Sequence, residues 1–115
     1  MLDVVKLPIE IDLTVEDLKN ESDDHIVIDV RPKHHFEIVS IENSVNFPLE
    51  ALKKDPSTCL DLIKSHKNAY IICRWGNASR RATDLLLKKG ACNIFNVRGG
   101  ITEWIEKIDP SLPMY

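Results

Sequence analysis

The chain has 115 residues, of which 43% are hydrophobic and 29% charged, and these values fit one soluble globular domain with its own core. A net charge of −3 gives no sign of nucleic-acid or membrane binding, and no apolar stretch approaches the roughly 20 residues that span a bilayer. Three cysteines without a Cys-x-x-Cys pair argue against a disulfide framework and against a zinc site. Since the start of the chain also lacks the pattern of a signal peptide, we expect a reducing, cytoplasmic location.

The first third of the chain predicts a strand, a helix, a second strand and a short helix. An extended piece at residues 9–11 precedes Thr14, which we expect to cap a helix with Asp17 as its reciprocal partner. Residues 25–30 form a nearly continuous apolar run, which is typical of a strand covered on both faces. A short helix is predicted over residues 32–38.

The middle of the chain repeats this alternation. A short strand at residues 44–47 precedes a helical stretch at 49–52 and a second helix at 57–65, for which Ser57 is the predicted N-cap. Residues 69–73 are apolar and are predicted to form the central strand of the sheet.

The last third predicts a helix over residues 82–89 that stops at Gly90, a strand over 94–97, and an amphipathic helix over 101–108. Strands that alternate with helices predict an α/β fold, with a mostly parallel sheet flanked by helices on both faces. We expect residues 1–115 to form a single domain of this kind.

Three segments are expected to meet at the carboxyl edge of the sheet, where open α/β sheets bind their ligands. Cys73 ends the central strand, Asp29 and Arg31 follow the second strand, and residues 98–100 follow the last one. Arg31 is expected mainly to pair with Asp29, although it could face the pocket, and Arg98 has the same two options.

Cys73 is the candidate nucleophile. It opens a short loop in front of a helical segment, where unpaired N–H groups and the helix dipole hold an anion and favour a thiolate. The loop contains no proline, so that its amides can curl around one anionic atom, and Gly76 permits the positive φ that such a curl needs. The alternative is a plain buried cysteine at the end of a strand. The loop reads Arg74, Trp75, Gly76, Asn77, Ala78 and Ser79.

Two thiol chemistries use a cradle of this kind. A cysteine-dependent phosphatase needs an arginine at the sixth position after the cysteine, but that position is Ser79, and Arg80 comes one residue later. Sulfur transfer needs room for only one sulfur atom, and the spacing favours it. Arg74, Trp75 and Arg80 are the side chains expected to select a substrate, although Trp75 could equally pack locally.

Four segments together resemble the rhodanese-like family. They are residues 29–32 (Asp-Val-Arg-Pro), 46–49 (Asn-Phe-Pro-Leu), 73–79, and 96–104 with its Gly-Gly-x-x-x-Trp ending. The chain is most similar to the C-terminal rhodanese domain of the eukaryotic adenylyltransferase–sulfurtransferases, which serve molybdopterin synthesis and activate the ubiquitin-related modifier of tRNA thiolation. The shared features are a Cys-basic-x-Gly-Asn-x-Ser loop and a Pro-x-Tyr terminus.

The resemblance implies that Cys73 accepts sulfur from a cysteine desulfurase as a persulfide, with residues 74–79 as its cradle. The sulfur then passes to the adenylated C-terminus of a ubiquitin-like carrier. Such enzymes also contain an adenylation domain, and the chain has no Gly-x-Gly-x-x-Gly motif. The chain is therefore expected to be either an excised domain or a stand-alone protein. In the first case ATP and zinc would belong to the missing part, and this chain itself would need no cofactor. A generic thiosulfate sulfurtransferase and an interaction module with an idle cysteine are the alternatives.

Overall fold

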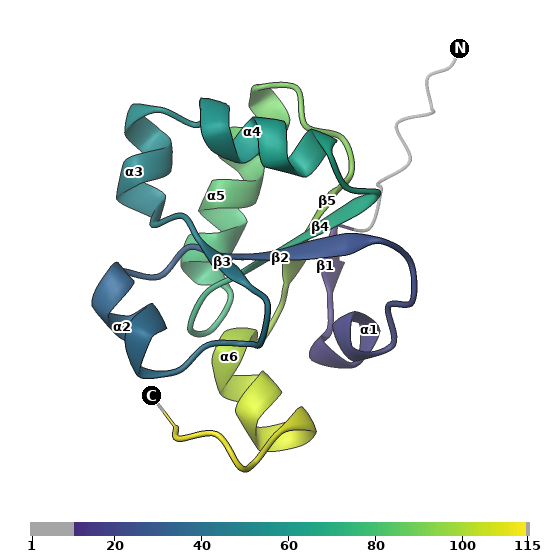
Figure 1. Cartoon of the computed structure of the whole chain (residues 1–115), viewed down its shortest axis with the longest axis vertical. Coiled ribbons are helices and arrows are strands. Elements are labelled where there is room, and N and C mark those ends of the chain that lie inside the picture. Colours follow the sequence, from purple (N-terminus) through teal and green to yellow (C-terminus); the bar gives the residue numbers. More distant parts are fainter. Residues whose placement is uncertain (1–10, 115) are drawn as a thin grey trace.

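Five parallel strands form the central sheet in the part of the chain that the structure describes. The computed structural model describes residues 11–114, and Figure 1 shows the strands crossing the middle of the molecule. Every pairing between the described strands is parallel, which confirms the predicted α/β class. In spatial order the strands are β1 (Asp12–Leu13), β5 (Ile94–Val97), β4 (Asn68–Ile72), β2 (His25–Asp29) and β3 (Val45–Asn46).

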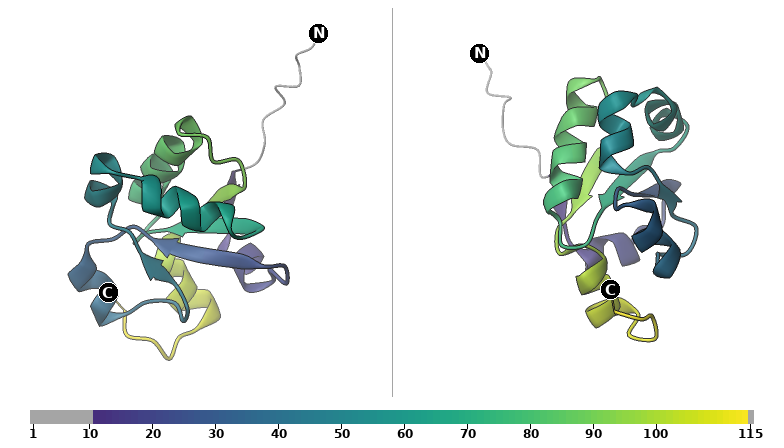
Figure 2. Two further views of the ribbon diagram at one scale, coloured as in Figure 1. Left: turned by 45° about the horizontal axis from the view of Figure 1, so that its top comes forward. Right: turned by 90° about the vertical axis from the view of Figure 1, so that its left-hand side faces the viewer.

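Helices cover both faces of this sheet. Figures 1 and 2 show α3, α4 and α5 on one face and α1 and α6 on the other, while α2 lies near the edge of the sheet. In the described part of the chain, none of these helices is long and apolar enough to cross a membrane. Their bounds are α1 (Val15–Lys19), α2 (Lys33–Ile38), α3 (Leu49–Lys54), α4 (Ser57–Lys64), α5 (Asn77–Lys88) and α6 (Gly100–Glu103), which continues into a π-helical turn (Trp104–Ile108).

Two apolar clusters, one on each face, anchor the central strand. Ala69 and Ile71 of β4 pack in the cluster that includes residues of α3, α4 and α5, whereas Tyr70 and Ile72 pack in the cluster of α1 and α6. This alternation follows from the period of two along a strand, and all four side chains are buried. Since each fully buried aliphatic side chain contributes about 1.5–3 kcal/mol, β4 is a rigid base for the residue that follows it.

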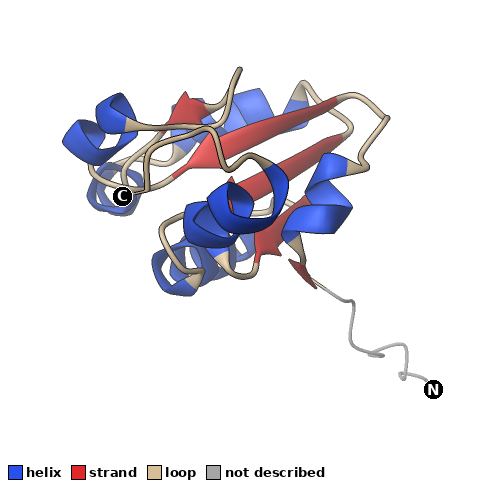
Figure 3. Ribbon diagram, turned by 90° about the horizontal axis from the view of Figure 1, so that it is seen from below, coloured by secondary structure: helices blue, strands red, loops and turns tan. Residues whose placement is uncertain are grey.

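The strand ends are level at the carboxyl edge of the sheet. Figure 3 shows the strands lying side by side. Asp29 at the end of β2 is in register with Ile72 at the end of β4, and the Val30 N–H donates to the Ile72 carbonyl at 2.9 Å. The segments that follow the two strands therefore emerge next to each other.

Several element boundaries differ from the predicted ones. Thr14 and Asp17 do form the expected capping box at the start of α1. The strand expected at residues 9–11 falls largely outside the described residues, and β1 instead comprises Asp12–Leu13. The C-terminal helix widens after Glu103, where the Asp109 N–H donates to the Trp104 carbonyl at 2.9 Å across a π-helical turn.

The prediction that Ser57 is the N-cap of α4 is wrong. Ser57 lies inside the helix, and its N–H and hydroxyl both donate to Asp55 Oδ1, at 3.0 and 2.7 Å. A carboxylate is the stronger acceptor, and its charge suits the positive end of the helix dipole, so Asp55 takes the capping role. The pKa of Asp55 is accordingly lowered by its hydrogen bonds from Ser57.

Candidate active site

Cys73 lies at the carboxyl edge of the sheet, between β4 and α5. Its side chain is 3% exposed. The Gly76 N–H donates to Cys73 Sγ at 3.1 Å, and the Ser79 hydroxyl oxygen lies 3.2 Å from the same sulfur. Two donors thus converge on the sulfur from one side, since the Ser79 hydroxyl can donate when the sulfur is a thiolate.

The loop curls because of Gly76. This residue has φ +111° and is the N-cap of α5, so that the helix begins directly after it. The first amides of a helix have no carbonyl partner within the helix, and those of Asn77, Ala78 and Ser79 form the first turn here. α5 starts five residues earlier than predicted, because polar and small residues occupy its first turn and give no apolar periodicity.

The N-terminus of α6 binds the backbone of the active-site loop, a contact that we call the α6 clamp. The Ile101 N–H donates to the Cys73 carbonyl at 2.8 Å, and the Thr102 N–H donates to the Arg74 carbonyl at 3.1 Å. Gly100 makes this approach possible, since a Cβ at this position would lie 2.4 Å from both carbonyl oxygens. Because both carbonyls point toward α6, the N–H of Gly76 can point toward the sulfur.

This clamp was not anticipated from the sequence. The sequence places residues 98–100 at this edge of the sheet because they follow the last strand, but it does not indicate which residues they contact. The Gly-Gly pair is the signal that could have revealed the contact, because paired glycines after a strand indicate a close backbone approach as well as a turn.

Asp29 and Arg31 form a buried ion pair beside the pocket. Arg31 Nε donates to both Asp29 oxygens at 3.0 and 3.1 Å, and Nη2 donates to Oδ2 at 2.8 Å. Arg31 Nη2 also donates to the Val39 carbonyl, and both charged side chains are at most 3% exposed. The pair therefore fixes the segment after β2, and in the described residues only Nη1 of this guanidinium is left without a hydrogen-bond partner.

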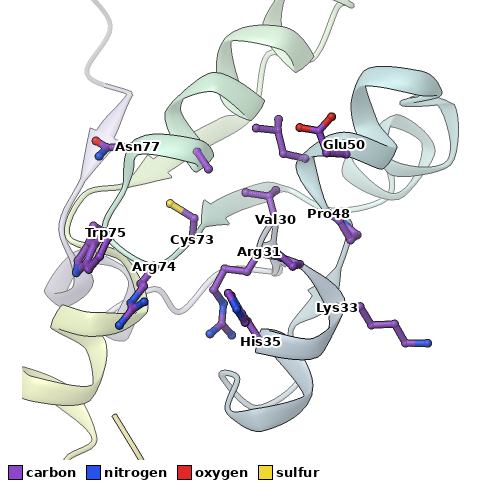
Figure 4. A pocket seen from close by; sticks show the side chains of 13 residues that line it. Val30, Arg31, Lys33, His35, Pro48, Glu50, Cys73, Arg74, Trp75 and Asn77 are labelled. Atoms are coloured by element: carbon purple, nitrogen blue, oxygen red, sulfur yellow. The ribbon is translucent and has the colours of Figure 1, made fainter. Parts of the chain in front are cut away.

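A cavity of about 620 Å³ opens at Cys73, between α2, α3 and the loop (Figure 4). Arg74, Trp75, Asn77 and Ala78 of the loop line it, together with residues from the starts of α2 and α3. The volume is within the range of small-molecule sites and far exceeds what one sulfur atom needs. The cavity therefore has room for part of a sulfur donor or acceptor.

The mouth of this cavity is basic. Arg31, His35 and Arg74 line it, whereas the Lys33 side chain extends outward from the start of α2 (Figure 4), where its ammonium lies 3.9 Å from Glu37. The pKa of His35 is lowered, first by burial and then by the charges of His34, Arg31 and Arg74. Glu50 is the carboxylate on the opposite side of the cavity.

Trp75 is the most exposed aromatic side chain of the described residues, at 59%. The Arg74 guanidinium lies 4.6 Å from the centre of its ring, a cation–π arrangement. Trp75 and Asn77 also line a second cavity of about 210 Å³ on the other side of the loop, where Arg98 lies. The loop thus separates two cavities.

Arg80, which was expected to help select a substrate, does not line the cavity that contains Cys73. Its guanidinium pairs with Asp12 at 2.9 Å and with Asp84 at 3.3 Å, next to the second cavity. Successive helical residues are turned by about 100°. Ser79 therefore faces the sulfur while Arg80 points away, which counts against the phosphatase chemistry.

The other two cysteines lie apart from this site. Cys59 is fully buried in the core, and burial raises the pKa of its thiol to about 12. Cys92 is exposed and comes before β5, at the opposite edge of the sheet from Cys73. Within residues 11–114, no group of three or more His, Cys, Asp or Glu side chains is arranged to hold a metal ion.

Comparison with known proteins identifies the family. The profile of the rhodanese-like domain matches residues 14–107, and the chain belongs to this family. The chain is 38% identical to the maize protein adenylyltransferase and sulfurtransferase MOCS3-2, over 95% of this chain and 24% of that protein. It is 40% identical to UBA4 of Saccharomyces cerevisiae, an adenylyltransferase and sulfurtransferase, over 79% of this chain and 22% of that protein. The chain thus spans about a quarter of the length of these relatives.

Solved structures agree with the fold. A rhodanese-related protein from Thermoplasma volcanium superposes with a TM-score of 0.67 at 31% identity, over 84% of this chain and 92% of that one. The human single-domain sulfurtransferase TSTD1 gives the same TM-score at 20% identity, over 84% of this chain and 96% of that one, which supports the fold alone.

Because of the α6 clamp, we expect two glycine-to-alanine substitutions to differ strongly in their effect on the free energy of unfolding. Both Gly100 and Gly90 have a positive φ, but a Cβ on Gly90 would have no atom within 4 Å. We expect Gly100→Ala to lower the free energy of unfolding by at least about 2 kcal/mol more than Gly90→Ala does, because only the first adds a backbone clash. Urea unfolding of the two variants measures this difference. Equal destabilisation by the two substitutions would show that the close approach of Gly100 to the loop carbonyls does not exclude a side chain.

The hydroxyl of Ser79 should matter for the reactivity of Cys73. We expect Ser79→Ala to slow alkylation of Cys73 by iodoacetamide at neutral pH by about fivefold, since a donor to the anionic sulfur is lost. Thr83→Val is the matched control, because the Thr83 hydroxyl is equally buried on α5 but donates to the Ser79 carbonyl. Peptide mass spectrometry separates Cys73 from the exposed Cys92. The same slowing in both variants would assign the effect to the helix instead of the Ser79 donor.

Proposed function

We propose that this domain is a rhodanese-type sulfurtransferase in which Cys73 carries the transferred sulfur as a persulfide. The observation that carries this proposal is the position of Cys73 Sγ, which receives the Gly76 N–H at 3.1 Å and lies beside the unpaired first turn of α5. Several amides of one loop can hold a terminal persulfide sulfur, which is anionic at neutral pH. The names of the relatives, which include sulfurtransferase, support the same chemistry.

In the first step the Cys73 thiolate attacks the outer sulfur of a donor persulfide. A bond forms between Cys73 Sγ and that sulfur, and the donor cysteine leaves as a thiolate. The proposed donor is the persulfide of a cysteine desulfurase. The cavity of about 620 Å³ leaves room for a donor loop to approach, and Arg74 at its mouth would offset the charge of the leaving thiolate.

In the second step the outer sulfur of the Cys73 persulfide attacks the adenylated C-terminal carbonyl of a ubiquitin-like carrier. Adenosine monophosphate leaves, and an acyl disulfide joins the carrier to Cys73. An external thiol then cleaves the S–S bond, so that the carrier leaves as a thiocarboxylate and the thiol remains on Cys73 as a mixed disulfide. A second external thiol restores the Cys73 thiol.

The carrier adenylate is formed elsewhere. The relatives are adenylyltransferases as well as sulfurtransferases by name, and the matched region is about a quarter of their length. In this proposal an adenylation domain holds ATP and zinc, and the rhodanese domain receives the activated carrier in the cytoplasm for tRNA thiolation, molybdopterin synthesis or both.

An anionic small donor such as thiosulfate is the second candidate substrate. The positive charge of Arg74 in the lining of the cavity favours it. The two candidates share the Cys73 persulfide and differ in what delivers and accepts the sulfur. Cyanide, which takes the outer sulfur as thiocyanate, is a suitable acceptor for comparing them.

Incubation with a cysteine desulfurase and cysteine should add the mass of one sulfur atom to the protein, and dithiothreitol should remove it. Cys73→Ala should gain no sulfur, because Cys73 is the proposed acceptor. Cys92→Ser is the control, since it removes an exposed thiol far from the loop, and it should gain sulfur like the original protein. Intact-protein mass spectrometry gives the readout. A stable added sulfur on Cys73→Ala would refute the assignment.

A further inference from the structure

We infer that the second cavity, beside Trp75, binds main-chain groups of the carrier's C-terminal tail and guides the end of that tail to Cys73. This inference rests on the proposed carrier function. Trp75 and Asn77 line both cavities, so an extended chain that crosses these two residues from the second cavity enters the first one, where Cys73 lies.

The second cavity has a fixed polar frame. Asp12 of β1 receives the Arg80 guanidinium on Oδ2 at 2.9 Å and the Asn96 amide on Oδ1 at 2.9 Å. The carboxylate of Asp12 thus connects three elements, β1, β5 and α5, and the Arg80 guanidinium offsets its charge. A frame of this kind holds its side chains in place before a ligand arrives.

One buried atom in this frame lacks a partner among the described residues, and an exposed arginine, Arg98, lies beside it in the lining of the cavity. Asn96 is 3% exposed, and its Oδ1 accepts no hydrogen bond. Its Nδ2 donates to Asp12 and, at 3.4 Å, to the Gly76 carbonyl, so a flipped amide would place its oxygen against two acceptors. The Arg98 side chain is exposed and forms no ion pair with another residue of the described range.

A peptide group matches Asn96 and Arg98. Asn96 Oδ1 lacks a donor, the exposed Arg98 guanidinium can donate to an oxygen, and each residue of a main chain supplies one N–H and one carbonyl oxygen. A free anion fits less well, because it would bring its negative charge beside Asn96 Oδ1 and the Asp12 carboxylate. The space of about 210 Å³ equals roughly seven water molecules, which suits a segment of small residues.

Trp75 gives the C-terminal tail of the carrier a surface on which to lie between the two cavities. A tryptophan that is 59% exposed, and that forms the wall between two cavities, offers an apolar surface across which a narrow chain can lie. The activated carbonyl must end at Cys73 because it is the group attacked. The residues just before it in the carrier are therefore the ones that cross Trp75 and reach Asn96 and Arg98.

The test compares two acceptors on protein loaded with persulfide sulfur. One acceptor is cyanide, and the other is a ubiquitin-like carrier that an adenylating enzyme has activated. In Arg98→Ala the ratio of kcat/KM for the carrier to kcat/KM for cyanide should fall about tenfold, through a higher KM for the carrier. Arg81→Ala is the matched control, since Arg81 is also an exposed arginine outside the ion pairs of the described chain but lines neither cavity.

A binding measurement makes the test independent of turnover. On addition of unactivated carrier to the ¹⁵N-labelled protein, the side-chain signals of Asn96 and Arg98 should shift, and those of Arg81 should not. If the original protein transfers sulfur to the carrier, but Arg98→Ala keeps the original ratio and these signals stay in place, the tail site is refuted. The same is true if Arg98→Ala slows sulfur uptake from thiosulfate as strongly, since the cavity would then recognise an anionic donor. Absence of carrier transfer by the original protein would instead refute the proposed function.

Discussion

The contact between α6 and the active-site loop is the constraint on which the site depends. The backbone of Gly100 passes so close to the carbonyls of Cys73 and Arg74 that no side chain fits between them. Two helix N–H groups take those carbonyls, and Gly76 then reverses the chain so that its own N–H meets the sulfur. Backbone groups thus shape the loop, and the Ser79 hydroxyl adds a side-chain contact to the sulfur.

The rim around this loop combines three kinds of surface. The Cys73 cavity is largely apolar with basic residues at its mouth, the second cavity is polar, and Trp75 lies between them. The chain as a whole has a net charge of −3, yet Lys33, Arg74 and Arg98 are gathered here on exposed positions. A basic rim on an acidic chain favours approach of negatively charged partners or substrates by this face.

The sequence predicts the strands and helix ends that depend on a local pattern of residues. Apolar runs locate the strands β2, β4 and β5, and Thr14 with Asp17 identifies the start of α1. Long-range contacts carry no such signal. The α6 clamp brings Gly100 next to Cys73, which is 27 positions away in the sequence. Beside the second cavity, Asp12 binds Arg80 and Asn96, and these three residues come from three different elements. Arg80 directly follows the loop in the sequence, which predicts a role in substrate selection at Cys73, but the turn of the helix directs its side chain toward Asp12 and Asp84.

A crystal structure of the protein with a persulfide on Cys73 would show directly where the outer sulfur lies. We expect this sulfur to lie within about 3.5 Å of the amide nitrogens in the first turn of α5, residues 77–79, with the Gly76 N–H still donating to Sγ. An outer sulfur that extends into the 620 Å³ cavity without touching any of these amides would contradict this expectation.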